Sequence, residues 1–305
     1  MKFNQLRDVV AIARRGSLRA AARELALSQP ALTRSVHELE RELGTALFER
    51  RARGMRLTPT GETFVQRATA ILSEVRRAQE EAAQLQGGTS GRVVAGLSFV
   101  PHVAMLPKAL PLFRKRYPQV ELHLIDGQFP ALEAKLRDGS VDFYVGPQHA
   151  QTLSSELMRE KLFDNTRVIV GRIGHPLKNT RSVHDLASAE WATTSITLNA
   201  LEELGEIFEQ RGLPSPRLVL QSQSSLTLTV ALGSSDLLAM VPVQWMEFPP
   251  FAGNLSIIRV KETFPAPPIV AIRRREMPLT PAAEHLLDLL RRNVPRQRRR
   301  QAGQG

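Results

Sequence analysis

Four polar side chains around residue 30 have the types and the spacing needed to recognise DNA bases. They fall on one side of a helix and are Gln29, Thr33, Arg34 and His37. Gln can form two hydrogen bonds with adenine, Arg suits guanine or phosphate, and the Thr methyl can contact that of thymine. A solvated helix face has a similar composition, so the neighbouring segments must decide between the two interpretations.

The neighbouring sequence predicts a helix that presents these side chains. Ser28 is a good N-cap because its hydroxyl can accept a hydrogen bond from the first turn, and Pro30 fits that turn and joins the polar side. The opposite side is an apolar stripe formed by Leu32, Val36, Leu39 and Leu43. Residues 17–25 predict a preceding helix, so the pair forms a helix-turn-helix whose second helix enters the major groove of DNA.

Residues 46–58 predict a short β-hairpin with a basic tip. Two apolar pieces flank a turn that ends at Gly54, and the turn carries Arg50, Arg51 and Arg53. Beside a helix-turn-helix, such a wing lies along the phosphate backbone or in the minor groove. An ordinary charged turn is the alternative interpretation.

Positive charge is concentrated at both ends of the 305-residue chain. Residues 1–60 carry twelve Lys or Arg and six Asp or Glu, and residues 291–300 add six Arg, within a total net charge of +11. The first cluster is the electrostatic footprint of a protein that binds nucleic acid. The second cluster lies mainly in a tail, residues 294–305, that we expect to be a disordered, solvated end.

Three motifs in this half resemble those of the LysR-type transcriptional regulators. They are A-A-x-x-L-x-L-S-Q-P-A-L-T, then L-E-x-E-L-G-x-x-L-F-x-R, then L-T-P-T-G. The resemblance is specific over residues 1–90 and continues more loosely to about residue 293. It assigns contacts with double-stranded DNA to Gln29, Pro30, Thr33, Arg34 and Arg53. It also implies a C-terminal domain that senses a small molecule, and it makes RNA polymerase a candidate partner.

Residues 59–86 predict one long helix with an apolar seam. The seam residues recur alternately every three and four positions and are Phe64, Ala68, Ile71, Val75, Ala78, Ala82 and Leu85. This heptad pattern suits packing against a second copy of the helix, although packing on the chain's own domain would need a similar face. A homodimer would present two helix-turn-helix units to a partly palindromic operator, and the resemblance extends the assembly to a homotetramer. The glycine-rich residues 87–91 predict a flexible hinge.

Beyond residue 91 strands alternate with helices, so the expected fold class is an α+β multidomain protein. Strand-helix-strand order predicts a parallel sheet, and one helix is expected over residues 102–117. The resemblance implies that the C-terminal part is a two-lobed, α/β, periplasmic-binding-protein-like effector domain. The expected boundaries are 1–58 for the winged helix-turn-helix, 59–86 for the linker helix, 87–91 for the hinge, 92–163 and 268–293 for lobe I, and 164–267 for lobe II.

The candidate effector contacts follow from the way in which open α/β sheets bind ligands. Ligands lie beyond the carboxyl ends of the strands and near helix N-termini. In lobe I this rule selects Ser98, Phe99, Val100 and Pro101, and in lobe II it selects Thr194, Ser195, Gln223, Val241 and Pro242. The resemblance places effector contacts at Ser98 and around Thr194 and Ser195. We expect a small organic anion, although each hydroxyl could instead serve only to cap a helix.

The sequence predicts no catalytic residue, metal site or cofactor. The seven histidines lack H-E-x-x-H spacing, no G-x-S-x-G motif occurs, and the chain has no cysteine. No apolar run is long enough to cross a bilayer and no secretion signal is evident, which favours the cytoplasm. Two other functions stay open: a solute-binding protein with an N-terminal anchor, and an architectural DNA-binding protein without an effector.

Overall fold

The computed structural model describes residues 1–51, 54–148, 152–194, 200–222 and 224–295. The chain begins with three helices, α1 (Phe3–Arg15), α2 (Leu18–Glu24) and α3 (Gln29–Leu43). Their shared core contains Ile12, Ala21 and the stripe residues Leu32, Val36 and Leu39. The predicted caps are present, since the Ser28 hydroxyl accepts from the backbone of Ala31 and Pro30 lies in the first turn of α3. Leu43 departs from the predicted stripe and is 38% exposed.

The predicted wing is present as β1 (Phe48–Arg51) and β2 (Gly54–Leu57), which pair antiparallel. The turn between α1 and α2 holds the wing in place, because the Met55 amide donates to the Gly16 carbonyl at 2.9 Å. Gly54 has a φ of +132°, and a Cβ atom there would lie 2.4 Å from that same carbonyl oxygen. Glycine is therefore required at this end of the hairpin.

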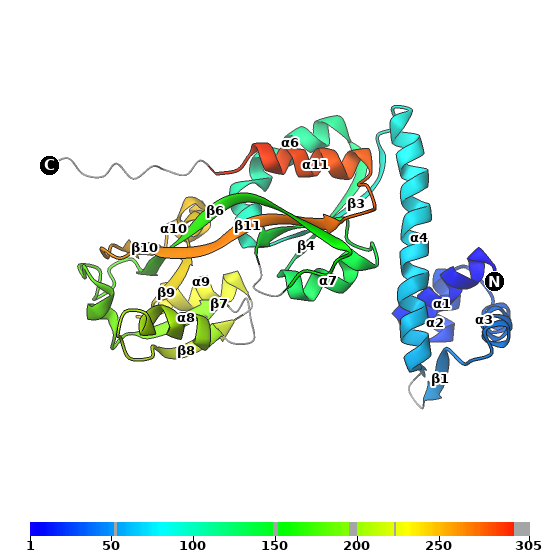
Figure 1. Ribbon diagram of the computed structural model, residues 1–305, viewed down its shortest axis with the longest axis horizontal. Coiled ribbons are helices and arrows are strands. Elements are labelled where there is room, and N and C mark those ends of the chain that lie inside the picture. Colours follow the sequence, from blue (N-terminus) through cyan, green and yellow to red (C-terminus); the bar gives the residue numbers. More distant parts are fainter. Residues whose placement is uncertain (52–53, 149–151, 195–199, 223, 296–305) are drawn as a thin grey trace.

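Helix α4 (Pro59–Leu85) joins the N-terminal unit to the rest of the chain (Figure 1). Its first turn is capped by Thr58, whose hydroxyl accepts from the Gly61 amide at 3.0 Å. Near the N-terminal end of α4, Phe64 of the predicted seam packs against the core of the three-helix unit, and Ala68 is also buried. The five seam residues from Ile71 to Leu85 are exposed in the single chain.

A mixed sheet forms the centre of the C-terminal domain. Lobe I begins with three parallel strands in the order β4-β3-β5, namely β4 (Gln119–Asp126), β3 (Ser90–Leu97) and β5 (Phe143–Pro147). Helices α6 (Leu106–Arg116) and α11 (Pro281–Arg292) pack on one face of this sheet, and α7 (Phe129–Arg137) packs on the other (Figure 1). The apolar strands therefore lie between two helical layers.

Two long strands connect the lobes. They are β6 (Leu157–Arg172) and β11 (Phe264–Arg274), which pair antiparallel, and β11 also pairs antiparallel with β5. Strands β9 (Ala239–Pro242) and β10 (Leu255–Ile258) add to β6 in the second lobe, also antiparallel. Within this central sheet the expected parallel pairing is thus correct only for β3, β4 and β5. The antiparallel part arises because the chain leaves lobe I along β6 and returns along β11.

Lobe II packs a second, two-stranded sheet and its helices on the far end of these strands. The sheet joins β7 (Glu190–Thr194) and β8 (Arg217–Ser222) in parallel. Its helical pieces are α8 (Ala200–Glu209), α9 (Ser225–Ser234) and the shorter η1 (Val183–Leu186), η2 (Val243–Glu247) and α10 (Pro249–Ala252). Within the described ranges no helix is long and apolar enough to cross a membrane.

The expected helix over residues 102–117 is instead two helices, α5 (Phe99–Ala104) and α6. They meet at Met105, which caps the end of the first and the start of the second. Pro107 fits the first turn of the new helix, where its missing amide costs little, and its ring favours the break. β3 begins at Ser90, so residues 86–89 alone separate α4 from the sheet.

Candidate DNA interface and effector site

Helix α3 presents the predicted base-reading side chains to solvent. Gln29, Pro30, Arg34 and His37 are exposed and Thr33 is half-buried. The opposite side of the same helix is fully buried at Leu32 and Leu39. The structure therefore brings all five predicted α3 residues together on one accessible face.

A buried carboxylate fixes α3 against α1. Asp8 is 1% exposed, and its Oδ2 accepts a hydrogen bond from the Ser35 hydroxyl at 2.6 Å. Its Oδ1 accepts a longer bond from Arg7 at 3.3 Å. Ser35 is the neighbour of Arg34, so this contact controls how the base-reading face is oriented. No local pattern in the sequence signals it, because Asp8 and Ser35 lie on different helices.

A second carboxylate connects α3 to the wing. Glu40 Oε1 accepts from the backbone amides of Leu47 and Phe48 at 2.8 and 3.2 Å. The other oxygen of Glu40 lies 3.2 Å from Nδ1 of His37. One side chain thus links the start of β1 to a predicted DNA contact, and the orientation of the wing depends on it.

The wing arginines are only partly described. Arg50 and Arg51 lie on β1, opposite Met55 and Gly54. Arg53 lies outside the described residues. The backbone therefore places two of the three predicted arginines at the end of the hairpin.

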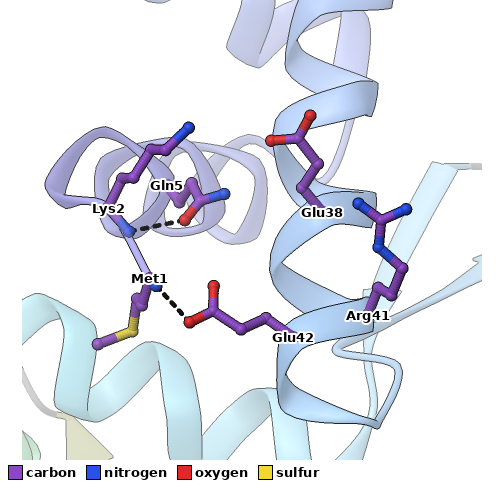
Figure 2. Close-up of a pocket in the computed structure, with 6 residues that line it drawn as sticks. All are labelled: Met1, Lys2, Gln5, Glu38, Arg41 and Glu42. Carbon is purple, nitrogen blue, oxygen red and sulfur yellow. Dashed lines mark hydrogen bonds and ion pairs between the residues drawn. The ribbon is translucent and has the colours of Figure 1, made fainter.

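A shallow hollow of about 270 Å³ lies between the start of the chain and α3 (Figure 2). The terminal ammonium of Met1 pairs with Glu42, and the Lys2 amide donates to Gln5 Oε1 at 2.7 Å. The remaining lining side chains are Glu38 and Arg41. Both charge signs are present there, so the hollow does not favour one class of ion.

Ser98 lies directly after β3 and is the N-cap residue of α5, so the three residues after it do not form a loop. Phe99, Val100 and Pro101 belong to α5, and Val100 and Pro101 are buried in the lobe. The prediction that these three residues lie in a connecting segment is therefore wrong, because α5 begins directly after Ser98, while their role as effector contacts stays a prediction. The Ser98 amide donates to the Val145 carbonyl at 3.0 Å, while its buried Oγ has no hydrogen-bond partner among the described residues.

Two further buried polar groups were missed in the sequence, and one of them, the Tyr144 hydroxyl, lies near Ser98. Gln128 Oε1 and the Tyr144 hydroxyl are also buried without a described hydrogen-bond partner. A Cβ at Gly146 would lie 2.0 Å from the Tyr144 hydroxyl and 2.9 Å from Ser98 Cβ, so these side chains meet. Burial raises the pKa of Tyr144 above its usual value, and the nearby Phe129 backbone and Ser98 side chain offset only part of the rise. The tyrosine is therefore a neutral hydrogen-bonding group.

The predicted contacts in lobe II lie at strand ends. Thr194 ends β7 and is half-buried, and it is paired with Ser222 of β8. Val241, which is buried, and Pro242 end β9. Ser195 and Gln223 lie outside the described residues.

An aromatic contact joins the two lobes beside Ser98. The rings of Phe99 in lobe I and Trp245 in lobe II have centroids 4.4 Å apart. Trp245 is 1% exposed, and it belongs to the core of lobe II. The lobes are thus in direct contact next to the predicted effector residues.

The arrangement of acidic and histidine side chains gives no candidate metal centre. Within the part of the chain that the structure describes, no group of three or more His, Asp or Glu side chains lies close enough to hold a metal ion.

Comparison with known proteins agrees with this architecture. Residues 3–62 match the family of bacterial regulatory helix-turn-helix proteins, lysR family, and residues 86–295 match the LysR substrate binding domain. Among curated relatives, the SDS degradation transcriptional activation protein of a Pseudomonas species is 29% identical over 299 residues, covering 94% of this chain and 95% of its own. The regulator TdcA of Escherichia coli K12 is 24% identical over 279 residues, covering 91% of this chain and 88% of its own.

Solved structures share the whole fold. Full-length CbnR in complex with its target DNA aligns with a TM-score of 0.70 at 21% identity, covering 96% of this chain and 100% of CbnR. A full-length variant of OxyR from Pseudomonas aeruginosa aligns with a TM-score of 0.71 at 23% identity, covering 96% of each chain. The two family matches together span most of the sequence, so the chain belongs to the LysR family of transcriptional regulators, which bind DNA and carry an effector-binding domain.

Proposed function

We propose that this protein binds a partly palindromic operator as a homodimer or homotetramer and changes how it binds when a small organic molecule enters between its lobes. The observation that carries the proposal is the face of α3, where base-reading side chains are exposed opposite a buried stripe. The wing then supplies cationic contacts with the DNA backbone. RNA polymerase is the further partner that we propose for a bound regulator, and the cytoplasm is the proposed location. No catalytic step or cofactor is part of this function.

The surface of α4 supports self-association. Ile71, Val75 and Leu85 are 43%, 37% and 73% exposed, and they follow the heptad spacing along one side of the helix. Apolar side chains in such a stripe gain stability when a second helix covers them. A dimer through α4 would hold two copies of α3 at a fixed spacing, which is why the operator is expected to have two related halves.

The buried polar atoms near Ser98 support the effector site. Hydroxyls and amides that are buried without partners cost free energy, and a bound ligand would supply the missing hydrogen bonds to Ser98, Gln128 and Tyr144. The anionic character that we expect of the effector stays a prediction from sequence. A thermal-shift screen of small organic acids tests it, because a bound effector raises the unfolding temperature.

The DNA assignment is tested by gel-shift titration of the region upstream of the gene against random duplex. Arg34→Ala should weaken specific binding by about 5- to 150-fold, which corresponds to about 1–3 kcal/mol for one base contact. Arg116→Ala removes the same charge from α6 in the effector domain and should leave specific affinity unchanged. Equal affinity of wild-type protein for both duplexes would refute the function. DNA footprints with and without an effector distinguish the proposed regulatory function from an architectural role.

A further inference from the structure

Helix α4 carries a second stripe of residues that points into its own effector domain. Ser73, Arg77 and Gln84 are buried, and their spacing of four and seven places them along one side of the helix. The exposed apolar seam at Val75, Ala78 and Ala82 is offset from this stripe. One helix thus has one surface for its own lobe I and another for a second copy.

Arg77 is the centre of the contact with lobe I. The side chains of Arg77 and Asp142 are 5% and 3% exposed, and Nε and Nη2 of the arginine lie 3.0 and 2.9 Å from Oδ1 of Asp142. Nη2 also donates to the Gly139 carbonyl at 2.6 Å, and Nη1 donates to Glu74 at 2.8 Å. All three nitrogens of the guanidinium group therefore have partners inside the protein.

The carboxylate that receives Arg77 is itself fixed to the central sheet. Oδ2 of Asp142 accepts a hydrogen bond from the Val94 amide of β3 at 2.7 Å. Glu74 of α4 adds a second link, because it also pairs with Arg274 of β11. The ion pairs thus attach α4 to two strands of the sheet, β3 and β11.

Gln84 repeats the attachment near the end of α4. Its amide nitrogen donates to the Ser90 carbonyl of β3 at 3.0 Å, and its oxygen accepts from the Ala282 amide of α11 at 2.9 Å. Rotation of α4 about residues 86–89 would break both contacts and would separate Arg77 from Asp142 and from the Gly139 carbonyl. The hydrogen bonds and ion pairs of Arg77 and Gln84 therefore all oppose such a rotation.

We propose that Arg77 is a positioning residue that locks α4 onto lobe I, so that the linker helix and lobe I move as one rigid body. Residues 87–91 then do not act as the hinge that their glycines suggest. Movement caused by an effector must instead occur between lobe II and lobe I, or between copies of the chain. The rigidity of this unit can be measured without DNA or effector. A result that contradicts the rigid unit is therefore distinguishable from one that contradicts the proposed regulatory function.

Distance measurements between two spin labels test the proposal. The chain has no cysteine, so Gln66→Cys on α4 and Lys135→Cys on α7, both at exposed positions, give two unique labelling sites. Residue 66 lies about 30 Å along the helix from residue 86, so a tilt of about 20° at the connection would shift the label by about 10 Å. Dilution with unlabelled protein leaves one labelled chain in each oligomer.

We expect a narrow distance distribution for the wild-type background and a distribution at least about 10 Å broader for Arg77→Ala, with unchanged far-ultraviolet circular dichroism. Gln79→Ala shortens an exposed polar side chain two residues further along the same helix and should leave the distribution narrow. Arg77→Lys keeps the charge but loses the planar fork and should broaden it to an intermediate extent. A broad wild-type distribution would overturn the proposal. So would an Arg77→Ala protein that is less stable but keeps the narrow distances, since Arg77 would then only stabilise the fold. If Arg77→Ala does not fold, the wild-type and Arg77→Lys distributions decide.

Discussion

Glu40→Ala is the substitution that should separate the wing from the base-reading helix. The change removes the acceptor of two backbone amides, and one of them belongs to Leu47, which is fully buried. Each hydrogen bond to a charged acceptor contributes about 1.5–3 kcal/mol, and the 14% exposure of the Glu40 side chain allows water to replace part of this. We therefore expect the N-terminal domain to lose about 3 kcal/mol of unfolding free energy.

The effect of Glu40→Ala on unfolding is large enough to measure directly. In a domain of about 60 residues each kcal/mol lowers the midpoint by about 4–8 °C, so the calorimetric transition of this domain should fall by about 12–24 °C. Hydrogen exchange at the Leu47 and Phe48 amides should accelerate as well. Glu38→Ala removes the same charge from the same helix but leaves both amides with their acceptor. If the Glu40→Ala and Glu38→Ala proteins have the same unfolding temperature and the same hydrogen-exchange rates at the Leu47 and Phe48 amides, the wing is not held by Glu40.

The remaining predictions concern assembly, pH and the effector. Val75→Asp should give a monomer in sedimentation experiments, because it places a charge in the apolar seam. Gln66→Asp adds the same charge outside the seam and should leave the protein oligomeric. A dimeric Val75→Asp protein would exclude this interface. Burial raises the pKa of Glu262, but the hydrogen bonds from the Ser182 hydroxyl and the Val183 amide lower it by more than burial raises it. The pKa of Glu262 therefore lies below its usual value. Its stabilisation is therefore present above the usual pKa and disappears as the pH falls through the lowered one. Glu262→Gln should reduce the unfolding temperature at neutral pH, approach wild type as the pH falls below the usual glutamate pKa of about 4.3, and match it below the lowered pKa. A constant difference across that range would contradict this assignment. Ser98→Ala should shift the response to the strongest stabilising organic acid to higher concentration without changing DNA affinity, and an unchanged dose-response curve would argue against the site.

The N-terminal part of the fold could be predicted because its signals are local. Ser28, Pro30 and Thr58 act through neighbouring residues, and the helices begin where these residues indicate. The alternation of apolar and basic residues around Gly54 likewise identified the wing. Caps, turns and periodic stripes involve side chains that are close in sequence, so the pattern contains the interaction itself.

The contacts that fix the site could not be predicted because their partners are far apart along the chain. Asp8 and Ser35 are 27 residues apart, and Arg77 and Asp142 are 65 apart. Nothing in the types or spacing of these residues distinguishes them from surface charges before the helices pack. The antiparallel pairing of β6 and β11 is missed for the same reason, since it depends on the path of the chain between the lobes.

The contacting rings of Phe99 and Trp245 bear on how sensitive the regulator can be. We expect a molecule that reaches Ser98 from between the lobes to part these rings, and ligand would then enter only the fraction of chains that are open. The apparent dissociation constant is the intrinsic one divided by that fraction, so a chain open about one time in ten responds at about tenfold higher concentration. Changes at Trp245 can therefore adjust the threshold of the response without altering either the DNA that is read or the groups that hold the ligand.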